Sequence, residues 1–218
     1  MTSLSDIWPP FGLRITAGPV QLSAVRDEDI PALVELVQAG IHEPDAMPFA
    51  VPWSAPAPPA ELAHSMATHY WETRAQFRPD RWNLELVVRW DGVVVGIQGF
   101  EASDYLVTHS GETGSWLGRA CQGRGIGTAM RQAICAFLFD YLDAQEITSA
   151  AFLDNPASWA VSRKVGYAAN GMFRQKRRDG ELAICRRLRL RPEDFVPGPC
   201  HPTVEGLAPL RRFLGLDA

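Results

Sequence analysis

The chain has 218 residues, 46% of them hydrophobic, which is enough for one large domain with a hydrophobic core. With 21 basic against 25 acidic residues the net charge is −4, which disfavours non-specific nucleic-acid binding as the main activity. The chain shows no signal peptide, no membrane-length apolar run and no Cys or His pattern typical of a metal site. We therefore expect a soluble cytoplasmic protein with reduced thiols, no metal and no membrane partner.

Residues 1–19 are rich in Pro and Gly, so they predict an irregular N-terminal segment, in which residues 13–16 could form a short edge segment. Residues 20–25 alternate as a strand does, and Asp27 can cap a helix that ends at Gly40. The Pro-rich stretch 41–59 carries spaced aromatic residues and predicts a long loop. Such a loop is either an anchored surface loop or a lid over a substrate site, and the sequence leaves both open.

Helical spacing resumes over residues 60–77. Two β-rich runs, 84–90 and 93–100, flank an Asp-Gly pair, which favours a type I′ turn because both central positions need a positive φ. These two runs therefore predict a β-hairpin. A further strand at about 112–117 leads into a glycine-rich loop.

This loop delivers Gly123, Gly125 and Gly127 where the chain turns into a helix. Unpaired N–H groups and the positive end of the helix dipole would then face outward, which predicts a site for phosphate groups. Arg119 and Arg124 could add positive charge. The order Gln-x-x-Gly-x-Gly matches neither the P-loop nor the dinucleotide-binding fingerprint.

The helix that follows places apolar residues along one face from residue 126 to 142. Residues 147–152 form a short strand of buried type, after which Asn155 can cap a helix over 157–165 that stops at Gly166. This region therefore predicts helix, strand and helix in succession.

A second hairpin is predicted from residues 167–175 and 181–190 around another Asp-Gly pair. The remaining residues, 191–218, form a tail with a short helix near 204–214. Leucines in that helix suggest docking on the domain or on a partner subunit, which makes a homo-oligomer an open possibility.

The order of elements predicts an α+β domain with a mixed sheet. Together with Gln122-x-x-Gly125-x-Gly127, and with Asn155-x-x-Ser158 running to Gly166-Tyr167, it resembles the GCN5-related N-acyltransferase (GNAT) family. Within that family it is similar to the ribosomal-protein alanine acetyltransferase type. The resemblance covers residues 20–190 and implies a single domain with a mostly antiparallel sheet flanked by helices.

The resemblance implies that acyl-CoA is the donor, with its pyrophosphate on the amides of the glycine loop. Its pantetheine arm would lie along the strand at Leu117 and Arg119, held by a hydrogen bond from Asn155. The positions that the family would use for the cofactor are Leu117, Arg119, Gln122, Gly123, Arg124, Gly125, Ile126, Gly127, Thr128, Asn155, Ser158 and Ser162.

One departure from the family concerns the general acid. Many members have a tyrosine seven residues after the Asn, where this chain has Ser162. The alanine acetyltransferase type is similar to this chain in having the serine of Asn-x-x-Ser, which implies Ser158 as the acid or the hydrogen-bond donor to the thiolate. Helix capping or a phosphate contact is the alternative for these serines. By similarity to the alanine acetyltransferases, Glu112 is the first choice of general base and Glu101 the second. The main-chain N–H of Leu117 would stabilise the oxyanion. A solvated carboxylate at a strand end is the alternative for Glu112.

Two functions follow from the resemblance: transfer of an acetyl or succinyl group to an amine, or a catalytically weak acyl-CoA-binding module with a regulatory role. The acceptor would be a protein N-terminus or a small amine. A looser similarity to bacterial GNAT members described as succinyltransferases suggests the longer, acidic donor. Its carboxylate would need an arginine, which Arg174, Arg177 or Arg178 could supply if the second hairpin folds over the cleft.

Overall fold

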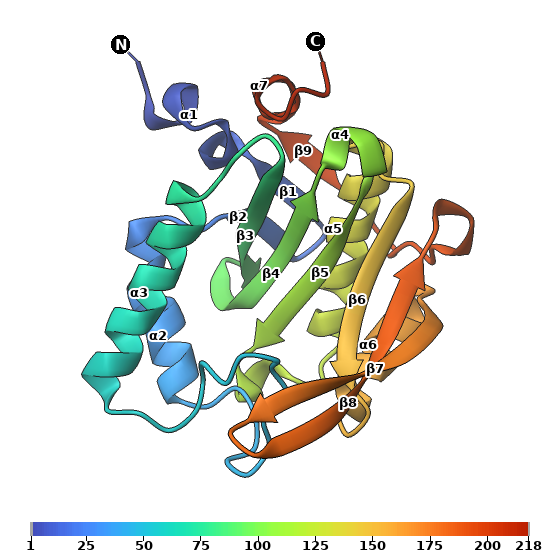
Figure 1. Cartoon of the computed structure of the whole chain (residues 1–218). Coiled ribbons are helices and arrows are strands. Elements are labelled where there is room, and N and C mark those ends of the chain that lie inside the picture. The colour runs from blue at the N-terminus through green and yellow to red at the C-terminus, as the bar shows by residue number, and fades with distance from the viewer. Residues whose placement is uncertain (1, 218) are drawn as a thin grey trace.

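The computed structural model describes residues 2–217 and contains one nine-stranded sheet. The strands are β1 (Arg14–Ala17), β2 (Val20–Ala24), β3 (Arg81–Trp90), β4 (Val93–Ser103), β5 (Ser110–Leu117), β6 (Glu146–Phe152), β7 (Ala168–Arg178), β8 (Glu181–Leu190) and β9 (Thr203–Glu205). Their order is β7-β8-β6-β5-β4-β3-β2-β1-β9, and every neighbouring pair is antiparallel except β5 and β6 (Figure 1). The predicted single domain with a mixed, mostly antiparallel sheet is confirmed.

Helices cover both faces of this sheet (Figure 1). They are α1 (Leu4–Ile7), α2 (Ile30–Gln38), α3 (Pro59–Ala75), α4 (Tyr105–Thr108), α5 (Ile126–Tyr141), α6 (Pro156–Val165) and α7 (Leu207–Phe213). The alternation of β3 divides the core in two: Leu84, Leu86 and Val88 pack with α5 on one face, whereas Val87 packs with α2 and α3 on the other. No helix among residues 2–217 is long and apolar enough to cross a membrane.

Both predicted hairpins are present. Asp91 and Gly92 have φ values of 48° and 82°, the positive values that the Asp-Gly pair predicts for a tight turn between β3 and β4. The second hairpin pairs β7 with β8. These turns were predictable because their signal lies in two adjacent residues.

Both chain ends belong to the fold. The N-terminal segment is more regular than expected and includes a strand close to the possible edge segment at residues 13–16, and the tail helix docks on the domain, which is one of the two alternatives stated above. Residues 2–19 contain α1 and β1, and β1 pairs with both β2 and β9, so the two ends of the chain complete one edge of the sheet. Trp8 of the N-terminal segment packs edge-on against Phe213 of α7, with the ring centroids 5.2 Å apart. Leu210 and Leu214 are buried in the same chain, so they offer no surface to a partner subunit.

β5 and β6 separate along their length, and this feature positions the site. Only three residue pairs join them, the last being Glu112 with Thr148, although β5 continues to Leu117 and β6 to Phe152. Figure 1 shows the two strands spreading apart toward their C-terminal ends. Beyond Glu112, therefore, the edge of β5 has no ladder partner on that side.

Candidate active site

The first turn of α5 has the features of an anion-binding site. Gly125 is its N-cap with a φ of 84°, and no side chain caps the first turn. Gly123 has a φ of 71°, and a Cβ atom added at either glycine would meet no atom within 4 Å. Free N–H groups, a helix dipole and open space above the backbone fit the pyrophosphate of CoA.

The side chains around this loop divide into those that hold its shape and those that are free to bind. Gln122 donates from Nε2 to the carbonyl oxygens of Ile41 (2.7 Å) and Leu117 (2.9 Å), so it joins the loop after α2 to the end of β5. Arg119 forms an ion pair with Glu43 at 2.7 Å. Arg124 is exposed at the surface.

Two further predicted positions follow Gly125. The side chain of Ile126 is buried, so only its main chain faces the loop. The N–H of Thr128 donates to the carbonyl of Gly125 at 3.1 Å and so closes the first turn of α5. Gly127 lies close to α6, where an added Cβ would stand 3.4 Å from Val161. The roles of these residues toward a cofactor remain predictions.

The free edge of β5 brings Leu117 toward the gap between β5 and β6. The N–H of Gly118 donates to Val95 on the β4 side at 3.0 Å. Successive N–H groups of a strand point to opposite sides. The N–H of Leu117 therefore points away from β4, toward the edge of β5 that is no longer paired with β6. This direction suits the predicted oxyanion donor.

The N-terminus of α6 lies beyond the end of β6 and carries the predicted Asn and Ser. Asn155 is the N-cap, and its Oδ1 accepts from the N–H of Ser158 at 3.1 Å. Its Nδ2 therefore points elsewhere and is available to an acceptor. Ser162 lies one turn on, is fully buried, and its hydroxyl has no hydrogen-bond partner within residues 2–217. We therefore leave Ser162 out of the site proposed below.

We expect Asn155→Ala to affect both stability and donor use. Loss of the cap should cost about 1 kcal/mol in the free energy of unfolding, and loss of Nδ2 should raise the KM for acyl-CoA. Ser158→Ala keeps the capped N–H, so it should leave stability unchanged and mainly lower kcat. Thermal unfolding and steady-state kinetics of both variants test this, and wild-type kinetics in both would contradict the assignment.

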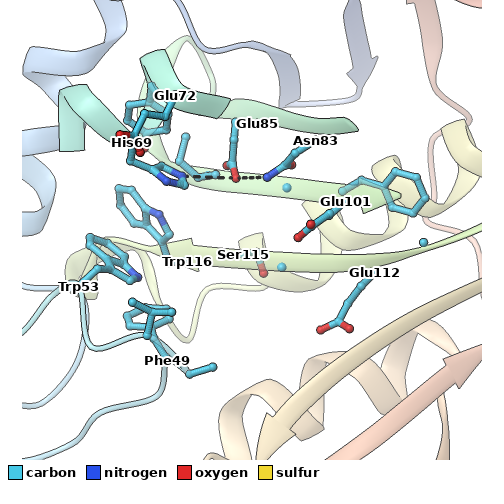
Figure 2. A pocket seen from close by; sticks show the side chains of 18 of the residues that line it. Phe49, Trp53, His69, Glu72, Asn83, Glu85, Glu101, Glu112, Ser115 and Trp116 are labelled. Carbon is cyan, nitrogen blue, oxygen red and sulfur yellow. Dashed lines mark hydrogen bonds and ion pairs between the residues drawn. The ribbon is translucent and has the colours of Figure 1, made fainter. Parts of the chain in front are cut away.

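A cavity of about 1200 Å³ lies over the face of β3, β4 and β5 opposite α5. Helix α3 and the 41–58 loop form its walls, and Figure 2 shows the side chains that project into it. Phe49 and Trp53 of the loop pack with ring centroids 5.0 Å apart, and Trp53 lies 5.9 Å from Trp116 of β5. The loop is therefore anchored by its aromatic residues on the core, and the same residues line the cavity.

Glu112 lines the cavity at the last pair of β5 and β6, where the strands part. It stands opposite Glu101 of β4 in the ladder, and Glu101 forms an exposed ion pair with Arg81 at 2.9 Å. The Glu112 residue is exposed, yet partial desolvation of its carboxyl group raises its pKa; the charge of Glu101 raises it further, and Arg131 and Arg187 oppose the shift. A carboxylate with a raised pKa is a stronger base near neutral pH than an ordinary glutamate.

A second polar group lies on the far side of the cavity and was not predicted from the sequence. Glu85 of β3 accepts a hydrogen bond from Asn83 at 3.0 Å and lies 3.7 Å from Nε2 of His69 on α3 (Figure 2). The neighbouring carboxylate of Glu85 raises the pKa of His69. The only signal in the sequence was a charged residue within an apolar strand.

Arg131 was also missed, because the helical pattern places it within the apolar face of α5. It is 4% exposed, and its guanidinium donates to Ser115 (2.9 Å), Gln98 (3.3 Å) and Ser149 (3.4 Å). All three acceptors are neutral. Ser149 is the first residue of β6 beyond the last pair with β5, so a buried positive charge lies where the strands separate.

Comparison with known proteins gives relatives of one kind. YdaF of Bacillus subtilis (strain 168), provisionally described as a ribosomal N-acetyltransferase, is 29% identical over 97 residues, which cover 44% of this chain and 50% of YdaF. This chain thus matches about half the length of that relative.

Solved structures share the fold at low sequence identity. Mycobacterium smegmatis RimJ in complex with CoA-disulfide superposes with a TM-score of 0.70 and 22% identity over 92% of each chain. RimL, a ribosomal L7/L12 alpha-N-protein acetyltransferase in complex with coenzyme A, gives a TM-score of 0.66 and 18% identity over 80% of this chain and 95% of its own.

The family model described as the acetyltransferase (GNAT) domain matches residues 20–168, more than half of the chain. These residues include the two motifs that the resemblance rested on, namely the glycine loop at the start of α5 and the stretch from Asn155 to Tyr167, and they also include the diverging strands β5 and β6. The chain belongs to the GNAT acetyltransferase family.

Proposed function

We propose that the protein moves an acyl group from CoA to an amine by direct transfer. One observation carries the proposal: the uncapped N-terminus of α5 and the free edge of β5 lead to a cavity whose end is marked by Glu112. A donor bound along this path would present its thioester to an acceptor in the cavity.

In the proposed reaction, Glu112 accepts a proton from the ammonium form of the acceptor. The amine nitrogen then bonds to the thioester carbon, and the N–H of Leu117 stabilises the oxyanion. When the intermediate collapses, the carbon–sulfur bond breaks and the sulfur leaves as CoA thiolate. The proton that the new amide nitrogen must lose goes to this thiolate, which gives CoA thiol and a neutral amide. Ser158, half-buried at the start of α6, donates a hydrogen bond to that sulfur.

The names of the relatives support the class of acceptor. RimL acts on ribosomal protein L7/L12 by its description, so we propose a protein N-terminus as acceptor, with a small amine as the alternative. Thiol release from acetyl-CoA or succinyl-CoA with a panel of N-terminal peptides and small amines tests this. Donor binding without turnover by any acceptor would favour the acyl-CoA-binding regulatory module instead.

We propose that the preferred donor is succinyl-CoA rather than acetyl-CoA. We further propose that its carboxylate meets Arg131 of α5 and not an arginine of the second hairpin. Arg177 forms ion pairs with Asp154 and Glu181, and Arg178 also pairs with Glu181. Arg131, in contrast, donates only to neutral acceptors and is buried on the α5 side of the sheet, near the point where β5 and β6 part. Burying a cation is costly; the charge of Glu112 offsets part of that cost, and a carboxylate on the acyl group would offset more of it.

We expect wild-type protein to have a higher kcat/KM with succinyl-CoA than with acetyl-CoA. Because hydrogen bonds to a buried charge are strong, Arg131→Met should reduce this ratio by about tenfold or more. Arg174→Met, at an exposed position of the second hairpin, is the control and should leave the ratio unchanged. A loss of preference in Arg174→Met alone would favour the hairpin, and equal use of both donors by wild type would return the chain to ordinary acetyl transfer.

A further inference from the structure

Side chains continue the contact between β5 and β6 at the step where the main-chain ladder stops. The last main-chain pair is Glu112 with Thr148. Just beyond it, the hydroxyl of Ser149 donates to the carbonyl oxygen of Thr113 at 3.0 Å, and the hydroxyl of Thr113 donates to the carbonyl oxygen of Thr148 at 3.2 Å. We call this step, made by Thr113, Thr148 and Ser149, the fork. Two main-chain carbonyls at the fork therefore have side-chain donors.

The hydroxyl of Ser149 takes the place of a main-chain donor. Residues two apart along a strand present their N–H and C=O groups to the same side. Because the carbonyl of Thr148 faces β5, the N–H of Ala150 faces β5 as well. In a regular parallel ladder that N–H would donate to the carbonyl of Thr113. Here Ala150 has no pair in β5, and Ser149 supplies the donor instead.

The directions of the hydrogen bonds at the fork follow from the number of hydrogens. A carbonyl can only accept, so Thr113 gives its one hydroxyl hydrogen to Thr148 and accepts from Tyr167, whose oxygen lies 2.9 Å away. Ser149 likewise gives its hydrogen to Thr113 and accepts from Arg131 at 3.4 Å. Neither hydroxyl can therefore turn away without leaving a partner unsatisfied.

The fork is enclosed on the α5 side of the sheet. The side chains that meet there are each at most 4% exposed, namely Thr113, Ser149, Arg131 and Tyr167. Arg131 also donates to Ser115 of β5 at 2.9 Å, so α5 holds both strands next to the fork. A buried carbonyl without a donor is costly, so loss of the Ser149 hydroxyl favours pairing of the Thr113 carbonyl with the nearest N–H.

On the basis of the proposed acyl transfer, we propose that Ser149 is a positioning residue for the donor. Its hydroxyl satisfies the carbonyl of Thr113, ends the main-chain ladder at Glu112, and so holds open the gap that receives the pantetheine arm. The N–H of Leu117 then stays free for the thioester, because Ala150 does not close the ladder. Ser149 is buried behind the strands, so it acts through their main chain and not by contact with the donor.

The test removes this hydroxyl and measures both the free protein and its complex with CoA. Ser149→Ala leaves the carbonyl of Thr113 without its donor, and the N–H of Ala150 is the replacement. We therefore expect hydrogen exchange of the Ala150 amide, followed by NMR in the free protein, to slow by about tenfold or more as the ladder closes by one step. Calorimetry should give a Kd for CoA about tenfold higher, because the narrower gap excludes the pantetheine arm.

Two control variants keep the fork intact. Ser149→Thr retains the hydroxyl, so it should retain the wild-type exchange rate at Ala150 and the wild-type Kd. Ser23→Ala removes another strand serine whose hydroxyl accepts from an arginine, Arg89, at 3.3 Å. Ser23 lies on β2, which β3 and β4 separate from β5, so this variant should leave both quantities unchanged. If Ser149→Ala does not fold, Ser149→Cys replaces it, because a thiol fills the space and is a weak donor.

The exchange rate of Ala150 separates this proposal from a purely stabilising role. Unchanged or faster exchange in Ser149→Ala would overturn the proposal, since the hydroxyl would then only stabilise the strands. Slower exchange with a wild-type Kd for CoA would also overturn it, because the gap would not depend on the fork. If wild-type protein binds no CoA, the proposed acyl transfer fails. The exchange rate alone then decides whether Ser149 ends the ladder.

Discussion

Gly125→Leu is expected to abolish measurable CoA binding while leaving the fold intact. Gly125 has a φ of 84° at the N-cap of α5, and the space above it is open. A leucine there would occupy the approach of the pyrophosphate to the free N–H groups of the first turn. Isothermal titration calorimetry with CoA measures the loss, and circular dichroism measures retention of the fold.

Backbone strain at position 125 could also lower CoA affinity by destabilising the fold. The control variant must therefore carry the same strain at a position outside the site. A non-glycine residue at positive φ costs about 1–2 kcal/mol. Gly92, in the turn between β3 and β4, has a φ of 82° and equally open surroundings. Gly92→Leu should therefore lower the Tm by as much as Gly125→Leu and still bind CoA with wild-type affinity. Normal CoA affinity in Gly125→Leu would show that the pyrophosphate binds elsewhere.

The parts of the site that the sequence predicted are those with a local signal. The glycine loop and the capping Asn155 each act through a few adjacent residues, and the structure places both at helix N-termini. The Asp-Gly turns were predictable for the same reason. Local backbone chemistry therefore sufficed to outline the donor side of the site.

The acceptor side could not be predicted, because its residues meet only after the sheet has formed. Glu85 and His69 come from a strand and a helix that the sequence described correctly, but nothing in either segment shows that they face each other. Arg131 lies among apolar residues of α5, and its polar partners come from β4, β5 and β6. Pairing across elements depends on sheet order and register, which one sequence does not fix.

The divergence of β5 and β6 explains why the predicted residues come together at all. The same separation that frees the N–H of Leu117 also ends the ladder at Glu112 and makes room for Arg131 beneath the gap. The proposed donor path, the proposed base Glu112 and the buried Arg131 thus depend on one change in strand spacing.

Glu112→Gln is expected to lower kcat by about 100-fold without changing CoA affinity, because the amide cannot accept the proton of the acceptor ammonium. The variant keeps the size and polarity of the side chain, so binding of either substrate should change little. Stopped assays of thiol release, combined with calorimetry for CoA, separate the two quantities. Full activity would leave Glu112 as a solvated strand-end carboxylate.

The pH dependence identifies the base more sharply than the loss of rate does. A carboxylate base works only when deprotonated, so activity falls as the pH drops through its pKa. Because desolvation and then the charge of Glu101 raise the pKa of Glu112, the acidic limb should lie at higher pH than for an ordinary glutamate. Glu101→Gln removes the second cause, so the limb should move to lower pH with kcat at its plateau retained. If Glu101→Gln instead abolishes turnover and Glu112→Gln does not, Glu101 is the base. If neither substitution changes kcat or the position of the acidic limb, the proton leaves the acceptor by another route.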